Sequence, residues 1–234
     1  MAKTHRTVAS VAFAVAMGVA GVSHAGLDFL TDEASFDVTA AGLTVQLFPD
    51  QYYSIWSMAG TLDASTDVTL NGHRGIAPGD IIPGLAIDGN DSSPGTHAIM
   101  FVKPGYVGNA NNAVFTDGLV LNLYFAPGVD TVGLGLLSYF GTSDIRVLVY
   151  DSAATLLGRM LVPNVQREGE GLFFGLQAND GDTISRITLI STSFKQAGVD
   201  LVKFGDRALQ VPEPATLMLL GLGLAGLGFS RRKQ

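Results

Sequence analysis

Short runs of β-branched and aromatic residues, separated by Gly, Pro, Asp and Asn, recur through the middle of the chain. In residues 120–125 and 145–150 the apolar side chains occupy every second position. A period of two predicts strands with one buried face. No helical period with capping residues accompanies these runs, so we expect no helix here. The expected strands are Leu43–Phe48, Asp67–Asn71, Ala98–Val102, Leu119–Phe125, Thr131–Ser138, Ile145–Tyr150, Leu156–Leu161, Gly171–Ala178, Ile184–Ile190 and Val199–Phe204.

The segments between the runs contain recognisable turn signals. Asn179-Asp180-Gly181-Asp182 predicts a hairpin, because Asn, Asp and Gly tolerate a positive φ. Asp80–Thr96 is rich in Gly, Pro and Asp and predicts a long loop. Ile184–Ile190 alternates imperfectly, which predicts a bulge or burial on both faces. Turns are also expected at the dipeptides Pro94-Gly95, Pro104-Gly105 and Pro127-Gly128.

Many short strands joined by turns are typical of an all-β sandwich or jelly roll. Two apolar segments flank this region, and each predicts a helix of its own. The expected organisation is a signal peptide over 1–25, a β-sandwich over 26–210, and a sorting signal with a transmembrane helix over 211–234.

The first segment has the three parts of a secretory signal peptide. Lys3 and Arg6 precede an apolar run over 7–22, and Ser23 and Ala25 supply small side chains before a cleavage point. The run is shorter than the roughly 20 residues that a membrane-spanning helix needs. We therefore expect export through the general secretion machinery, with cleavage after Ala25.

The second segment begins with Val211, Pro212, Glu213 and Pro214. Both prolines fix φ and disfavour helix before them, so Glu213 is expected in an extended stretch. Ala215–Phe229 follows without a charge, and Arg231, Arg232 and Lys233 close the chain. The basic residues predict a cytoplasmic C-terminus by the positive-inside rule.

The order of these three parts resembles the PEP-CTERM sorting signal of Gram-negative bacteria. The resemblance implies an exosortase as partner, a transient stay in the inner membrane, and a final location at the cell surface or in the matrix. It also implies a host that makes exopolysaccharide. We further hypothesise that Glu213 is the chemistry that the sorting enzyme recognises.

The second half resembles the passenger domains found ahead of such signals. The matching stretches are Ile145–Asp151, Phe173–Ala178, Ile184–Leu189 and Asp200–Gly205. This resemblance implies a β-sandwich similar to carbohydrate-binding modules, without a defined ligand site.

Composition narrows the function classes. The absence of Cys excludes disulfide scaffolds, thiolate metal sites and cysteine nucleophiles. Residues 26–210 contain 9 Lys and Arg against 20 Asp and Glu, a net charge of −11, which argues against a nucleic-acid partner. No cofactor is expected.

Two clusters are candidate ligand sites. Asp88, Asn90 and Asp91 gather oxygen ligands as a calcium loop does, although the spacing is not that of an EF-hand; a solvated turn is the alternative. Tyr52 and Trp56 fall on one side of a strand and could stack on a sugar, and burial of Trp56 in the core is the alternative.

No catalytic motif is present in the sequence. We expect a structural or adhesive protein associated with exopolysaccharide, and not an enzyme. The alternatives are a secreted hydrolase acting on glycans and a passenger that pairs only with other matrix proteins.

Overall fold

The computed structural model describes residues 26–48, 55–58, 61–70, 73–90, 99–102, 112–116, 118–139, 141–166, 171–193 and 196–207. For residues 55–58, 69–70, 73–75, 90 and 99–102 it describes the backbone alone. The signal-peptide and sorting-signal predictions therefore lie outside the described residues. None of the helices in these ranges has the length and apolarity that crossing a membrane requires.

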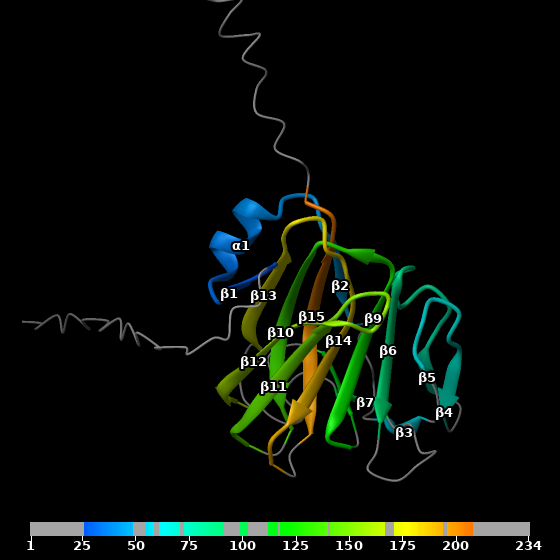
Figure 1. The fold of residues 1–234 in the computed structure, drawn as a ribbon. Coiled ribbons are helices and arrows are strands. Elements are labelled where there is room, and N and C mark those ends of the chain that lie inside the picture. Colours follow the sequence, from blue (N-terminus) through cyan, green and yellow to red (C-terminus); the bar gives the residue numbers. More distant parts are fainter. Residues whose placement is uncertain are drawn as a thin grey trace, which may run out of the picture.

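The described strands form two stacked antiparallel sheets and a small third sheet (Figure 1). Sheet A has the order β1 (Leu27–Leu30), β13 (Leu172–Ala178), β10 (Thr131–Ser138), β15 (Ala197–Gly205), β8 (Ala113–Thr116), β7 (Ile99–Val102) and β3 (Ile55–Met58), with β2 (Thr44–Leu47) also paired to β15. Sheet B has the order β12 (Leu156–Val165), β11 (Ser143–Tyr150), β14 (Ile184–Ser191), β9 (Val120–Val129) and β6 (Leu85–Asn90). The third sheet pairs β4 (Val68–Leu70) with β5 (His73–Ile76).

The hydrophobic core lies between sheets A and B. In β9 and β11 every second side chain is buried, as the alternation predicts. These side chains meet those of β10, β13 and β15 in one apolar cluster, which includes Leu134, Val147, Leu176, Ile187 and Val202. The expected all-β sandwich is confirmed.

The strand predictions are accurate in the second half and incomplete in the first. Residues 131–138 form a strand with the predicted bounds, and the other predicted strands are present with shifted ends. The imperfect alternation of β14 coincides with a register shift between Ile184 and Arg186. Strands β1, β5, β6 and β8 were not predicted, and β3 was expected only as the strand that carries Trp56.

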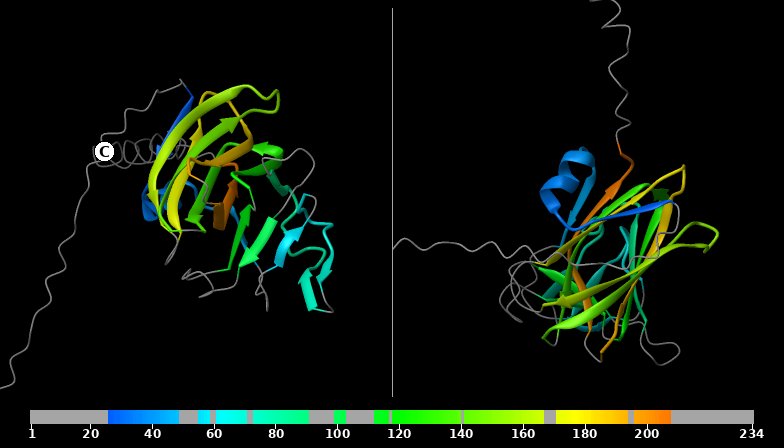
Figure 2. Two further views of the ribbon diagram at one scale, coloured as in Figure 1. Left: turned by 90° about the horizontal axis from the view of Figure 1, so that it is seen from below. Right: turned by 60° about the vertical axis from the view of Figure 1, so that its left-hand side comes forward.

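The expected absence of a helix is wrong, because α1 spans Glu33–Thr39. Asp32 caps it by accepting a hydrogen bond from the Ser35 amide at 2.9 Å. The helix has seven residues and buries only Phe36, so it is too short to display a helical period. Figure 1 and the left view of Figure 2 place α1 and the β4–β5 sheet at opposite ends of the molecule.

Phe36 is fully buried on the outer face of sheet A, against the ring of Phe173 at a centroid distance of 5.1 Å. Glycine makes room for it. A Cβ atom on Gly175 would lie 2.5 Å from Phe36 Cδ2, and one on Gly133 would lie 2.9 Å from Phe36 Cε1. Two glycines on adjacent strands thus form the floor that receives the helix.

Lys203 on β15 fixes the polar side of α1. Its ammonium group lies 2.8 Å from a Glu33 carboxylate oxygen and 2.6 Å from one of Asp37. Burial lowers the pKa of Lys203, but the hydrogen bonds and charges of the two carboxylates outweigh it, so the pKa is raised. The ion pairs hold one face of the helix over the sheet while Phe36 anchors the other.

Three turn predictions need correction. Asp180 and Gly181 do have positive φ values of 56° and 84°, but the turn joins β13 of sheet A to β14 of sheet B and makes no hairpin. Pro127-Gly128 lies inside β9, at the register shift, and not in a turn. The long loop expected over 80–96 contains β6.

The chain passes between the sheets twice at one end of the sandwich, and Asp130 holds the two crossings together. Asp130 itself joins β9 to β10. Its carbonyl accepts from the Ala178 amide at 2.7 Å, and its carboxylate accepts from the Arg207 amide at 2.8 Å. Arg207 Nη2 donates to the Ala178 carbonyl at 2.7 Å. The Asn179 amide donates to the Gly26 carbonyl at 2.6 Å, so both ends of the described sandwich meet here.

The glycine floor gives the first prediction. Gly175→Ala should lower the free energy of unfolding by about 1–3 kcal/mol through steric overlap, and Phe36→Ala by about 3–5 kcal/mol through loss of packing. The destabilisation of the double variant should be at least about 1 kcal/mol smaller than the sum of the two single destabilisations, because without the Phe36 ring the new methyl group meets no overlap. Urea unfolding of the four proteins measures this. Strict additivity would contradict the contact.

The ion pairs of Lys203 give the second prediction. Lys203→Met should lower the free energy of unfolding by about 0.5–1 kcal/mol at neutral pH, since both carboxylates are half exposed. The pKa of Lys203 is raised in the folded state. The ion pairs therefore contribute fully to the free energy of unfolding below the ordinary pKa of 10.5, and this contribution is lost as the pH rises through the folded-state pKa. The gap to wild type should therefore close at high pH. Lys203→Arg, which stays charged, is the control, and a gap that persists for Met would refute the assignment.

Candidate functional site

Most of the sequence-predicted site residues lie outside the described part of the chain. This holds for Ser23 and Ala25, for the sorting residues 211–214 and 231–233, for Tyr52, and for Asp91. Trp56 belongs to β3, as a strand position requires, but its side chain is not among those described.

Asp88 lies within a strand and not in the loop expected of a calcium site. It occupies the middle of β6, opposite Asn122 of β9, and Asn90 follows two positions later on the same strand. Among the described residues, no three His, Asp or Glu side chains lie close enough to hold a metal ion.

The outer face of sheet B, which points away from the core, carries the most distinctive set of polar and aromatic side chains. The strand registers arrange these side chains in rows that cross the sheet. We call two of them the tyrosine–arginine row (Leu156, Tyr150, Arg186, Tyr124 and Ala86) and the polar row (Arg159, Leu148, Thr188, Asn122 and Asp88). Directly opposed residues on antiparallel strands have Cβ atoms about 4.5–5.5 Å apart, so each row is continuous.

A cation–π contact organises the tyrosine–arginine row. The guanidinium carbon of Arg186 lies 4.1 Å from the centroid of the Tyr150 ring. Arg186 is also paired in register with Tyr124 on its other side. All three side chains are half-buried, so each offers one side to solvent. The row therefore combines flat aromatic surfaces with a planar cation.

The polar row lies one step further along the strands. The Thr188 hydroxyl donates to Asn122 Oδ1 at 2.8 Å, which fixes the orientation of the amide. Asp88 and Arg159 stand at the two ends of the row, on β6 and β12. Amide, hydroxyl and charged groups fixed on rigid strands can accept and donate hydrogen bonds with little entropic cost.

A cleft of about 380 Å³ adjoins the tyrosine–arginine row. Tyr124 and Ala86, at the end of the row, also line this cleft, whose opposite wall is formed by residues 63–65. Hydrogen bonds from the Ser65 side chain, and next from its amide, hold the pKa of Asp63 below its usual value. The row and the cleft thus form one continuous surface with an ionised carboxylate at its far edge.

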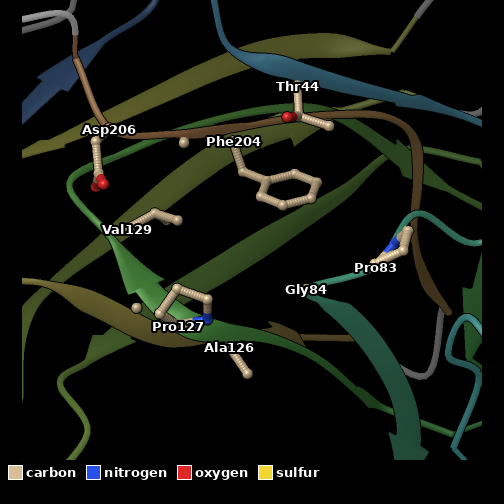
Figure 3. Close-up of a pocket in the computed structure, with 10 residues that line it drawn as sticks. Thr44, Pro83, Gly84, Ala126, Pro127, Val129, Phe204 and Asp206 are labelled. Carbon is tan, nitrogen blue, oxygen red and sulfur yellow. The ribbon is translucent and has the colours of Figure 1, made fainter.

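A second cleft of about 390 Å³ lies beyond Pro83, Gly84 and Ala126, which line both clefts. Figure 3 shows the ring of Phe204 pointing from β15 into the space between Ala126-Pro127 and Pro83-Gly84. Asp206 at its edge accepts a hydrogen bond from the Asp130 amide at 3.2 Å. The rest of the lining is mainly apolar side chains and backbone, so this cleft presents few polar groups to a ligand.

The sequence contained one signal for the outer face of sheet B. The alternation places Asn122 and Tyr124 opposite the buried leucines of the same strand, and places Arg146 and Tyr150 opposite buried residues of another. The order of strands in the sheet brings these side chains together, and that order cannot be read from spacing. Arg186 was not singled out because it lies beside a register shift.

Comparison with known families identifies the C-terminal segment of the chain. Residues 210–233 match the family model of the PEP-CTERM protein-sorting motif. The chain carries a PEP-CTERM sorting motif. The resemblance noted in the sequence is thereby confirmed, and the motif indicates an exported protein that an exosortase sorts at the membrane.

Solved structures that match this chain include carbohydrate-binding modules. A mutant family 29 module complexed with mannohexaose has 14% identity and a TM-score of 0.29, with coverage of 66% of this chain and 93% of that chain. A module from Clostridium stercorarium in complex with cellobiose has 17% identity and a TM-score of 0.23, with coverage of 63% and 94%. None of the curated proteins compared with this chain matches it.

Proposed function

We propose that this protein is delivered to the cell surface or extracellular matrix and there binds exopolysaccharide through the outer face of sheet B. The sorting motif at 210–233 supports the route. The tyrosine–arginine row is the observation that carries the binding role. Tyrosine rings combine a large apolar surface with a polar tip, which suits the alternating apolar faces and hydroxyls of a sugar ring.

The extent of the surface favours a polymer over a small ligand. The tyrosine–arginine row crosses all five strands of sheet B and continues into the cleft lined by Tyr124. Adjacent strands are about 4.8 Å apart, so four spacings give a track of roughly 19 Å before the cleft begins. A site of this kind contacts several consecutive units of a chain.

We further propose that binding is not accompanied by hydrolysis. A glycosidase needs one carboxyl group that is protonated at working pH as well as a second, ionised one. The pKa of Asp63 in the cleft is lowered, so it is a poor proton donor at neutral pH. Asp206 in the other cleft is engaged by the Asp130 amide. The role is therefore structural or adhesive.

The terminal segments complete the proposal. A signal peptide cleaved after Ala25 directs the chain to the secretion machinery, and the segment after Pro214 holds it transiently in the inner membrane. Arg231, Arg232 and Lys233 keep the last residues in the cytoplasm. The organisation into 1–25, 26–210 and 211–234 follows from this division of tasks.

The sorting motif gives the third prediction. In the native host, Glu213→Ala should leave the chain in the inner membrane unprocessed, because a lone carboxylate between two prolines is the recognised group. Fractionation followed by immunoblotting measures the processed fraction. Ala215→Ser, two positions along, is the matched control and should be processed as wild type. Normal processing of the Glu213 variant would refute the role of this residue.

The binding face gives the fourth prediction. The full chain, purified in mild detergent, should sediment with the exopolysaccharide of its host and release no reducing sugar from it. Tyr124→Ala combined with Tyr150→Ala should reduce the bound fraction at least fivefold, whereas Leu47→Ala on sheet A should not. Sugar release would favour a hydrolase. Binding to matrix proteins alone, in preparations free of polysaccharide, would favour the role of a protein-pairing passenger.

A further inference from the structure

The described cationic side chains divide into two groups. Lys203 and Arg207 contact carboxylates, with Lys203 Nζ 2.8 Å from Glu33 and Arg207 Nε 3.5 Å from Asp130. The other three are Arg146, Arg159 and Arg186, and within the described ranges none of them has a carboxylate within ion-pair distance. This is unexpected in a region with 20 acidic residues against 9 basic ones.

All three of these arginines lie on the outer face of sheet B. Arg159 of β12 is opposite Leu148 of β11, and Arg146 stands two positions before Leu148 on the same strand face. Arg186 of β14 is opposite Tyr150, two positions after Leu148. Diagonal neighbours of this kind are about 7–8 Å apart. The three guanidinium groups therefore surround Leu148 as one cationic patch.

Among the described residues, two carboxylates share this face, and both stand at its margins. Asp144, at the start of β11, accepts a hydrogen bond from the Asn164 amide at 2.9 Å. Asp88 lies on β6, three strands away from β11. The centre of the face is thus positively charged on a protein that is acidic elsewhere.

Arg186 supplies a second observation that points to a ligand. Its Nε atom is buried and has no hydrogen-bond partner. Arg186 as a whole is only half-buried, so the outer part of its guanidinium group remains open to an acceptor from outside the chain. The stacking of the guanidinium on Tyr150 fixes its plane and prepares it for a planar, bidentate acceptor.

We propose that this patch recognises the carboxylates of an acidic polysaccharide, a polymer that contains uronic acids. The proposal rests on the proposed function and adds the ligand class. Arg146 and Arg159 are exposed and reach carboxylates of successive units, while Arg186 and the flanking tyrosines hold a sugar ring. The repulsion of polyanions by the rest of the acidic surface confines binding to this face.

Affinity electrophoresis tests the proposal, with the full chain in mild detergent run through gels that contain alginate, dextran or double-stranded DNA. Wild type should be retarded by alginate with a dissociation constant that rises with salt. Arg146→Gln with Arg159→Gln should raise that constant at least tenfold. Val38→Glu with Leu47→Glu is the matched control, because it changes the net charge equally at exposed positions of α1 and β2; its constant should stay within twofold.

Three outcomes would overturn the proposal: an unchanged constant in the arginine variant, equal losses in both variants, or stronger retardation of wild type by DNA than by alginate. Near-UV circular dichroism confirms that both variants are folded. If wild type binds dextran or the host exopolysaccharide but not alginate, the proposed function stands and the acidic ligand is refuted. If it binds none of these polysaccharides, both fail.

Discussion

The carboxylate of Asp130 is the contact on which the arrangement of the two sheets depends. It accepts from the Arg207 amide and, at 2.6 Å, from the Thr131 hydroxyl, and Arg207 reaches on to the Ala178 carbonyl. One residue thus links the crossing from β9 to β10 with the crossing from β13 to β14 and the end of β15. The chain passes from one sheet to the other within one residue. The backbone groups at this corner therefore need hydrogen-bond partners from other segments of the chain.

This corner also lies next to the candidate binding face. β9 and β14 both start or end at it, and the register shift beside Pro127 and Ile184 brings Tyr124 opposite Arg186. Moving a strand by one residue would turn every side chain to the other face. The row on sheet B therefore depends on the strand registers, and its side chains are placed on strands instead of loops.

Sequence patterns predicted those parts of the structure whose cause is local. Alternation located β9 and β11, because each buries one face against the same core. It failed for α1, where a single buried residue, Phe36, leaves no period to detect. It failed again for β6, because Asp88 and Gly89 are residues typical of turns. Their strand conformation depends on pairing with β9, which the local sequence does not reveal. The candidate site shows the same division: the outward residues were identifiable, and their assembly into rows was not, because it depends on strand order.

The sandwich begins at Gly26 and ends at Arg207 beside the same turn, three residues before the sorting motif. A chain attached through that motif would therefore transmit any pull into β15 from one end. β15 lies between β10 on one side and β2 and β8 on the other. Tension along it must shear the hydrogen bonds of both ladders at once, instead of opening them one by one. The attachment point of this protein is thus a strand that is paired on both sides within its larger sheet.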